Sequence, residues 1–540
     1  MKKRYVVLVV LCCLVLGFVA GTYLMSRAYR RQSAVLVDYI TRVSGGTNNK
    51  ISTLISAIDR MYVDSVDVDT LIEAALPLLL EKLDPHSAYY PAVEAQESND
   101  ELHGSFSGIG IQFSMQEDTI HVNSVVRGGP SEKVGVLAGD RILYIDDSLF
   151  AGKKMNSNDI VRNLRGPEGS EVKIGVLRPG DEGIIDFTIE RGPIPVKSVD
   201  AAYLISDDIG YIVLNKFGET TYSEMMTGLA KLKNEGCRKL IVDLRGNTGG
   251  FLGAAIQIVN EFLPKGRMIV YTQGLHSEYE AEYANGRGLF QNIPMVVLID
   301  EISASASEIF SGAIQDNDRG TIVGRRSFGK GLVQQPIDFS DGSSVRLTIA
   351  RYYTPSGRCI QKPYGGDEDY EMDILNRWSR GEFFSADSVR FDESQMFTTK
   401  AGRTVYGGGG IMPDVFVPQD TLPYNEYYAS VVRRSLSNAF ALKYVDSHRS
   451  ELSALDTWQE IVSYLDKHNA DGEFEAYIRS KDIERPSSLP SEIREQLKRI
   501  LRAGIIYDVA DMQEYLAYIN TFDTTVGKAL ELLEDDSSAD

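Results

Sequence analysis

A buried strand that runs into a turn of small residues and then a helix restricts the possible folds of this chain more than any other segment. Residues 295–300 read Met-Val-Val-Leu-Ile-Asp, an apolar run typical of a parallel strand covered on both faces. Residues 303–308 read Ser-Ala-Ser-Ala-Ser-Glu, and helical periodicity follows as far as Asp318. This succession predicts an α/β domain whose turn presents a serine oxygen beside backbone N–H groups. Such N–H groups are what a developing oxyanion requires.

A serine hydroxyl is a weak nucleophile and needs a base. The nearest candidate along the chain is Lys330, 25 positions beyond Ser305, which can serve if burial lowers its pKa. The residues alone do not choose among Ser303, Ser305 and Ser307. They also leave open a plain helix N-cap at the turn and a solvated lysine in a glycine-rich loop.

Two rival chemistries are disfavoured by the sequence. The six histidines are His86, His103, His121, His276, His448 and His468. None is near the serine turn or the lysine in sequence, which argues against a Ser-His-Asp arrangement, and Asp-Pro before His86 suggests a structural residue in a turn that ends a helix. Residues 324–330 have the spacing of a phosphate-binding P-loop, but the motif then needs Ser or Thr where the chain has Gly331. Residues 332–337 also read as a strand, whereas a P-loop opens a helix.

Over about residues 45–420 the chain resembles the C-terminal processing peptidases, also called tail-specific proteases. The matching elements occur in the order of that family, and the ordered set is far more specific than any one of them. They are Leu83-Asp84-Pro85-His86-Ser87, Gly108-Ile109-Gly110-Ile111, Ala138-Gly139-Asp140-Arg141-Ile142-Leu143, Gly210-Tyr211-Ile212, Asp243-Leu244-Arg245-Gly246-Asn247-Thr248-Gly249-Gly250, the serine turn, residues 324–334, Tyr353-Thr354-Pro355-Ser356-Gly357 and Gly410-Ile411-Met412-Pro413-Asp414.

The resemblance implies a set of catalytic residues. Ser305 matches the nucleophile, Lys330 the general base, and Gln334 the third residue, which holds the lysine in place. The implied oxyanion hole is the N–H of Ala306 with an N–H of the Gly249-Gly250 turn, Gly250 being the preferred donor. Glycine suits that turn because it allows positive φ and close approach of a substrate carbonyl.

Residues 101–195 resemble a PDZ domain, with short strands and glycine turns. The resemblance implies that the loop Gly108-Ile109-Gly110-Ile111 presents N–H groups to the terminal carboxylate of a peptide, which would add to the adjacent strand edge. Arg165 stands where some relatives have an arginine that links the PDZ and catalytic domains and gates the site. A solvated arginine at a helix end is the plainer interpretation.

The remaining segments complete the predicted organisation. Residues 32–100 read as helical, with apolar spacing in 51–62 and 71–83. Residues 196–425 are expected to form the α/β protease core, interrupted at about 365–409 by a polar segment that reads as a surface elaboration or flexible flap. Residues 426–540 read as charged amphipathic helices with an acidic tail, a kind of region that can mediate oligomerisation.

The N-terminus predicts a membrane anchor. Three basic residues precede an apolar run from Tyr5 to Met25, about the length that spans a bilayer, and no clear cleavage site follows. Residues 1–31 are therefore expected to form a cytoplasmic stub and signal-anchor, with the other domains on the periplasmic side; a cleaved signal and secretion is the alternative. Arg27, Arg30 and Arg31 nearly balance the basic residues before the span, so this topology rests partly on the family resemblance.

Composition excludes several classes of protein. The net charge of −20 argues against a nucleic-acid partner, since no basic block occurs beyond the N-terminal region. Cys12 and Cys13 lie in the apolar run, and Cys237 and Cys359 alone are too few for a disulfide framework. No metal-ligand spacing is present, so no metal or cofactor is expected. The expected partners are proteins with accessible C-termini and the membrane, with a homo-oligomer or an activating adaptor left open.

The interpretation that combines these features is a membrane-anchored serine endopeptidase that takes protein tails in its PDZ domain and cleaves them with a Ser-Lys pair. The alternative is a PDZ-based tethering protein that is catalytically silent or held latent.

Overall fold

The computed structural model describes residues 50–116, 118–178, 180–365, 370–390 and 392–535. The chain forms two compact units, residues 1–83 and 84–540. In the first, α2 (Lys50–Met61) and α3 (Val68–Leu80) occupy the ranges for which helical spacing was predicted. Asp67 caps α3 by accepting from the N–H groups of Asp69 and Thr70. The predicted signal-anchor lies outside the described residues, and within them no helix has the length and apolarity to cross a bilayer.

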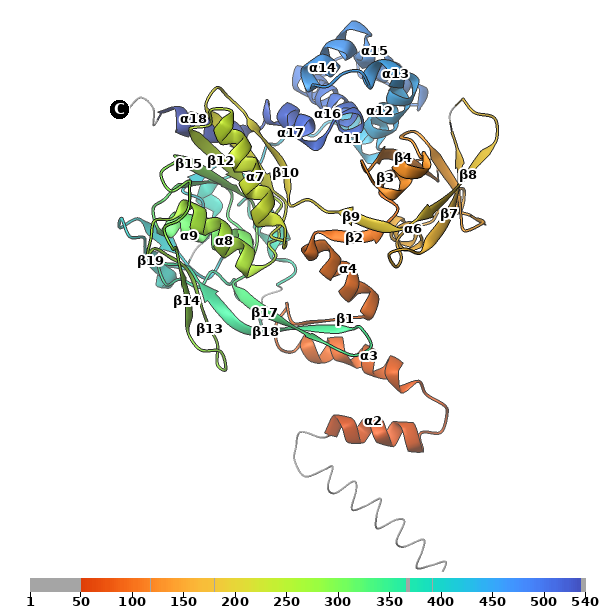
Figure 1. Cartoon of the computed structure of the whole chain (residues 1–540). Helices are drawn as coiled ribbons and strands as arrows, with labels where there is room; N and C mark the ends of the chain where they lie inside the picture. The colour runs from red at the N-terminus through yellow and green to blue at the C-terminus, as the bar shows by residue number, and fades with distance from the viewer. Residues whose placement is uncertain (1–49, 117, 179, 366–369, 391, 536–540) are drawn as a thin grey trace, which may run out of the picture. The chain divides into compact units, whose positions relative to one another are not determined.

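The second unit is built on a six-stranded sheet in the order β10-β11-β12-β15-β16-β21 (Figure 1). The strands from β11 onward are parallel, whereas β10 runs antiparallel to β11. Their bounds are β10 Val199–Leu204, β11 Ile209–Leu214, β12 Lys239–Asp243, β15 Met295–Ile299, β16 Thr321–Gly324 and β21 Val415–Phe416. All five residues of β15 are buried, so the prediction of a fully covered parallel strand is confirmed.

Successive strand residues point to opposite faces, and each face of this sheet has its own helical cover. One face packs with α7 (Thr221–Asn234), α8 (Leu252–Phe262) and α9 (Ala306–Asp316) into the main core. The other face packs against α18 (Thr524–Asp535) through Val526, Ala529 and Leu533. The last helix of the described residues therefore packs on the central sheet, although it lies far beyond the predicted domain boundary at residue 425.

A second sheet carries the segment that follows the lysine. Its order is β1-β18-β13-β14, with β17 also paired to β18. The bounds are β1 Ala88–Tyr90, β13 Met268–Gln273, β14 Glu280–Tyr283, β17 Leu332–Asp338 and β18 Ser344–Tyr353. Lys330 lies two residues before β17, so the segment after it is a strand, as predicted, rather than the helix of a P-loop.

The predicted PDZ region forms a separate sheet in the order β3-β4-β5-β7-β8, with β6 paired to β5. The chain enters through α4 (Ala92–His103) and β2 (Ser105–Gly108), and leaves through β9 (Gly192–Pro195), which pairs with β2. The other elements are β3 Ile111–Gln116, β4 Thr119–Val125, α5 Pro130–Val134, β5 Arg141–Ile145, β6 Ser148–Leu149, α6 Ser157–Leu164, β7 Glu171–Leu177 and β8 Ile184–Glu190. They enclose their own apolar core.

Helices follow the core, as the sequence predicted. They are α11 Glu426–Arg433, α12 Leu436–Ser447, α13 Arg449–Leu452, α14 Trp458–Lys467, α15 Ala470–Ser480, α16 Ser491–Val509 and α17 Met512–Asn520. These helices surround one shared apolar core.

The polar segment at about 365–409 is more ordered than predicted. It contains α10 (Asp373–Ser379), the 3-10 turns η2 (Ala386–Ser388) and η3 (Glu393–Gln395), and the hairpin β19 (Met396–Thr398) and β20 (Thr404–Tyr406). Arg377 and Glu382 within it are buried, which a surface elaboration or flap would not require. A charged sequence can have such buried residues when their charges pair, as Arg377 and Glu382 do.

Candidate active site

The serine turn lies at the carboxyl end of β15, where open α/β sheets place their ligand sites. Ser305 is the N-cap of α9 and adopts φ 55° and ψ −112°, a positive-φ conformation that is unusual for a non-glycine residue. Strain of this kind is often found at functional sites. The neighbouring Ala304 and Ala306 are buried, so only small side chains fit at this turn.

The three serines of the turn have different hydrogen-bonding roles. Ser303 Oγ donates to the carbonyl of Leu244 (2.8 Å), and Ser307 Oγ donates to that of Asn247 (2.9 Å). Both side chains are fully buried. Ser305 is partly exposed, and none of the hydrogen bonds in the described part of the chain has its hydroxyl as donor. Of the three, Ser305 therefore has the hydroxyl proton that a base could remove.

The predicted glycine turn lies against Ser305. It follows β12, the strand next to β15, and a Cβ atom built on Gly249 would stand 2.8 Å from Ser305 Cβ and 2.9 Å from the Ala306 nitrogen. Asn247 joins the two turns: its carbonyl accepts from Ala304 N–H (3.0 Å), and its Oδ1 accepts from Gly249 N–H (2.8 Å). The Gly249 N–H is thus already bonded, which makes Gly250 the better candidate donor to a substrate oxygen.

Lys330 lies in a largely buried loop beside the serine turn. Burial, reinforced by the nearby positive charge of Arg346, lowers the pKa of Lys330 below its ordinary value. Tyr352 reaches both catalytic candidates, because its hydroxyl lies 3.0 Å from the carbonyl oxygen of Ser305 and also contacts that of Lys330. No described hydrogen bond joins Ser305 Oγ to Lys330 Nζ.

Glu308 links the serine turn to the lysine loop, and the sequence analysis missed it. One carboxylate oxygen accepts from Ser305 N–H and Lys330 N–H, both at 2.8 Å. The other accepts from Ser327 Oγ (2.5 Å) and Gly329 N–H (2.7 Å). The side chain is fully buried, and burial raises the pKa of Glu308 to about 7 despite these bonds. Its position at the third residue of α9, where a capping box places Glu, was the signal available in the sequence.

The Asp-Pro-His-Ser segment also lies at the lysine, although it is more than 240 residues away in sequence. Gln334 Nε2 donates to the carbonyl of His86 over a long 3.4 Å, and His86 Nε2 lies 2.7 Å from the hydroxyl of Tyr370. Burial, together with the charge of Lys330, lowers the pKa of His86 to about 4, so its ring is neutral at neutral pH. His86 does lie in a structural turn, as predicted, but that turn borders the catalytic candidates.

Arg346 offers a test of the electrostatics around Lys330. Its positive charge disfavours the charged lysine, so Arg346→Gln should raise the pKa of Lys330 toward the ordinary value. A smaller fraction of Lys330 is then neutral at any given pH. Because only the neutral amine can act as a base, we assign the rising limb of the pH–rate profile to deprotonation of Lys330, and this limb should move to higher pH. Arg351→Gln, on the same strand, is the matched control. A profile that is identical in Arg346→Gln and wild type would contradict the assignment of that limb to Lys330.

The predicted carboxylate loop lies between β2 and β3. Gly110 has φ 76°, and Ile109 is buried in the PDZ core. β3 is at the end of the sheet order, so one of its edges is unpaired within the described sheet. Arg165 ends α6 with its guanidinium 4.1 Å from the ring centre of Phe106 in β2, and no described contact joins it to the protease core. Its predicted gating role stays a prediction.

Comparisons with known proteins agree with this architecture. Residues 208–372 match the model of Peptidase family S41, residues 107–189 that of the PDZ domain, and residues 427–511 that of a family of unknown function. The carboxy-terminal-processing protease of Bartonella bacilliformis is 37% identical over 361 residues, which cover 64% of this chain and 80% of that protein. The carboxy-terminal processing protease CtpB of Bacillus subtilis is 34% identical over 320 residues, covering 58% of this chain and 65% of that protein. Among solved structures, the photosystem II D1 C-terminal processing protease is 24% identical with a TM-score of 0.34, covering 68% of this chain and 92% of that one.

An α/β core joined to a PDZ domain, with these matches, defines a serine-type peptidase. The chain belongs to the carboxy-terminal processing proteases. The family resemblance seen in the sequence is confirmed, and the PDZ domain implies binding of peptide C-termini.

Proposed function

We propose that this protein is a Ser-Lys endopeptidase that binds the C-terminal tails of its substrates in the PDZ domain and cleaves those substrates with Ser305 as the nucleophile. The observation that carries the proposal is the shared carboxylate of Glu308, which ties the strained Ser305 turn to the buried Lys330 loop. Neutral Lys330 removes the hydroxyl proton as Ser305 Oγ attacks the scissile carbonyl. Ala306 and Gly250 N–H groups stabilise the oxyanion, whose collapse breaks the peptide C–N bond while the protonated Lys330 gives its proton to the leaving amine. Lys330, neutral again, then takes a proton from the water that hydrolyses the acyl-enzyme and returns it to Ser305 Oγ.

Gln334 is proposed to restrain the lysine side chain from the neighbouring strand β17. The loop Gly108-Ile109-Gly110-Ile111 is proposed to take the terminal carboxylate, with the peptide added along the free edge of β3. No step requires a metal or an organic cofactor. The apolar run of residues 5–25 supports a further proposal, an anchor in the inner membrane with the protease on the periplasmic side.

The defining experiment incubates the purified protein with an unfolded polypeptide that has an apolar C-terminus. Wild type, Ser305→Ala and Lys330→Met are run in parallel, and product masses are recorded. The matched substrate control is the same polypeptide with an amidated C-terminus, which removes the carboxylate. We expect only the wild-type protein to cleave, and we expect it to cleave the polypeptide with a free C-terminal carboxylate faster than the amidated one. Tail binding without cleavage by wild type would instead indicate a silent tether.

A latent enzyme is the second candidate, favoured by the missing hydrogen bond between Ser305 Oγ and Lys330 Nζ. A free, non-cleavable tail peptide added to a substrate that lacks a tail separates the two cases. Acceleration by the peptide would indicate that tail binding activates the protease, whereas inhibition or no effect would indicate constitutive activity.

A further inference from the structure

The polar insertion at about residues 365–409 donates hydrogen bonds to the loop that leads to Lys330. Arg377, in α10, is 1% exposed. Its Nη1 donates to the carbonyl of Ser327 (3.0 Å), and its Nη2 donates to that of Arg326 (2.6 Å). Two consecutive carbonyls of the lysine loop are thereby held by one guanidinium, whose planar fork fixes direction as well as distance.

A buried carboxylate keeps this guanidinium in place. Glu382 is 2% exposed and accepts from Arg377 Nε at 2.8 Å. It also accepts from Arg326 Nε (2.7 Å) and Nη2 (2.9 Å). The insertion therefore contacts the loop through its backbone and through the side chain of Arg326. Buried charges that are paired in this way are costly to disrupt, because loss of one partner leaves the others unpaired.

The loop is consequently held from two sides. Arg377 binds the carbonyl groups of residues 326 and 327, while Glu308 of α9 binds the N–H groups of residues 329 and 330. Only Phe328 lies between these two sets of contacts. The direction in which Lys330 leaves the backbone thus depends on the insertion as well as on the helix that begins at Ser305.

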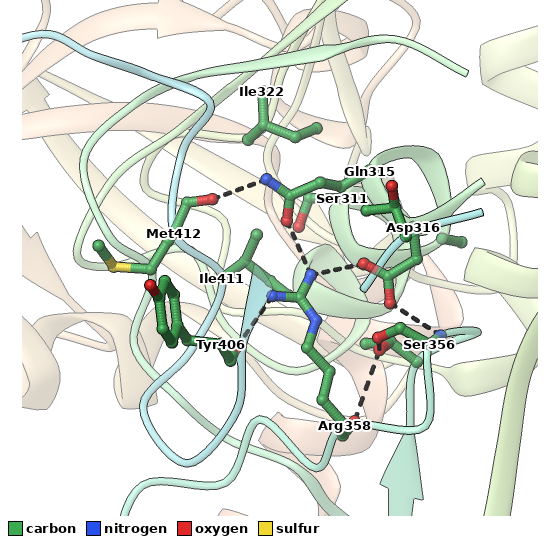
Figure 2. Close-up of polar contacts among 12 residues, drawn as sticks. Ser311, Gln315, Asp316, Ile322, Ser356, Arg358, Tyr406, Ile411 and Met412 are labelled. Atoms are coloured by element: carbon green, nitrogen blue, oxygen red, sulfur yellow. Dashed lines mark hydrogen bonds and ion pairs between the residues drawn. The ribbon is translucent and has the colours of Figure 1, made fainter. Parts of the chain in front are cut away.

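Both ends of the insertion are fixed to that same helix. Figure 2 shows Arg358, just before the insertion, bonded to the carboxylate of Asp316 (2.7 Å) and to the carbonyl of Tyr406 near its end (2.9 Å). Gln315, beside Asp316 in α9, donates to the carbonyl of Met412 (2.8 Å). Arg358 and Asp316 are both fully buried. The insertion therefore has a rigid base from which α10 can hold the loop.

We propose that the insertion is a positioning element for the catalytic lysine, with Arg377 as its positioning residue. The inference rests on the proposed role of Lys330 as general base. Without Arg377 the loop keeps its contacts with Glu308, but the carbonyl groups of residues 326 and 327 lose the guanidinium that they bind. The lysine then departs from its productive direction, and a displacement of about 1 Å can cost roughly 100-fold in rate.

The test compares wild type, Arg377→Ala, Arg377→Lys and the matched control Arg380→Ala, an exposed arginine just past the end of α10. Steady-state cleavage is measured across pH, together with thermal unfolding. We expect Arg377→Ala to lower kcat by about 100-fold with KM changed by less than about threefold, and to move the rising limb of the pH profile to higher pH as water reaches Lys330. Added guanidinium ion should restore at least about a tenth of the lost rate, whereas Arg380→Ala should match wild type.

A folded Arg377→Ala protein with the wild-type pH profile and kcat would overturn the inference. If that variant does not fold, Glu382→Gln is measured in the same way, since it weakens the pairing of Arg377 while keeping side-chain volume; an unchanged profile there has the same meaning. Lys330→Met distinguishes a failure of the proposed Ser-Lys chemistry from a failure of the positioning role. Residual activity in Lys330→Met would refute the Ser-Lys chemistry, whereas an inactive Lys330→Met beside a normal Arg377→Ala would refute the positioning role alone.

Discussion

Replacing Ser305 by Ala or Lys330 by Met will abolish peptide-bond cleavage while leaving the fold intact. Alanine removes the attacking oxygen, and methionine keeps an unbranched side chain of similar length but has no basic nitrogen. Because the two residues act in one step, each single change should lower kcat by at least about 10⁴-fold, and the double variant should be little worse. The measurement is product formation by mass spectrometry, with folding followed by circular dichroism.

Ser303→Ala is the matched control for the serine. It deletes a hydroxyl from the same turn, but that hydroxyl donates to the carbonyl of Leu244 in the core. The same hydroxyl accepts from the N–H of Asp300, which loses its acceptor, so we expect a loss of about 1–3 kcal/mol in the free energy of unfolding and retained cleavage. Substantial activity in purified Ser305→Ala, or loss of activity in a folded Ser303→Ala, would show that the nucleophile has been misassigned.

Glu308→Gln should separate the serine turn from the lysine loop. An amide nitrogen cannot accept hydrogen bonds, so one pair of donors, either those of Ser305 and Lys330 or those of Ser327 and Gly329, faces another donor. Leaving two buried donors unsatisfied should cost about 2–6 kcal/mol of unfolding free energy at pH 8. Ser305 and Lys330 would then be misaligned, and the variant should cleave its substrate about 100-fold more slowly. Urea unfolding and single-turnover cleavage at pH 8 measure the two effects.

Glu301→Gln is the matched control, because its carboxylate makes one recorded pairing, with Arg325 at 2.8 Å. It should lose less stability and no catalytic rate. Wild-type kcat in a folded Glu308→Gln protein would show that the shared carboxylate does not couple the two segments.

The raised pKa of Glu308 also predicts how stability changes with pH. Between its ordinary value of 4.5 and about 7, the folded protein keeps a proton that the unfolded chain has lost. The contribution of this group therefore makes the free energy of unfolding fall as pH rises through that window and level off above it. Glu308→Gln should lack this component. Identical pH dependence in wild type and variant would mean that Glu308 titrates at its ordinary pKa.

The sequence predicted the local elements well and their mutual contacts poorly. The run 295–299 is a buried parallel strand because its apolar residues need cover on both faces, a property that can be read from five residues. His86 was not placed beside Lys330, because nothing local to an Asp-Pro-His turn says which strand it will meet. Arg377 and Glu382 of the insertion are buried as a pair, and nothing local to a charged segment indicates which of its charges will pair.

The family, the order of the domains and the residues that match a Ser-Lys pair could be predicted from the sequence, since they depend on motifs and spacing along the chain. Three properties of the site could be seen only in the folded structure: which serine hydroxyl of the turn donates no hydrogen bond, which glycine N–H is unbonded, and that Glu308 joins the serine turn to the lysine loop. Those properties depend on what the neighbouring strands and loops offer to each polar atom. A hydrogen bond between residues 247 and 304, or between 326 and 377, is set by packing in three dimensions, and no periodicity along the chain encodes it.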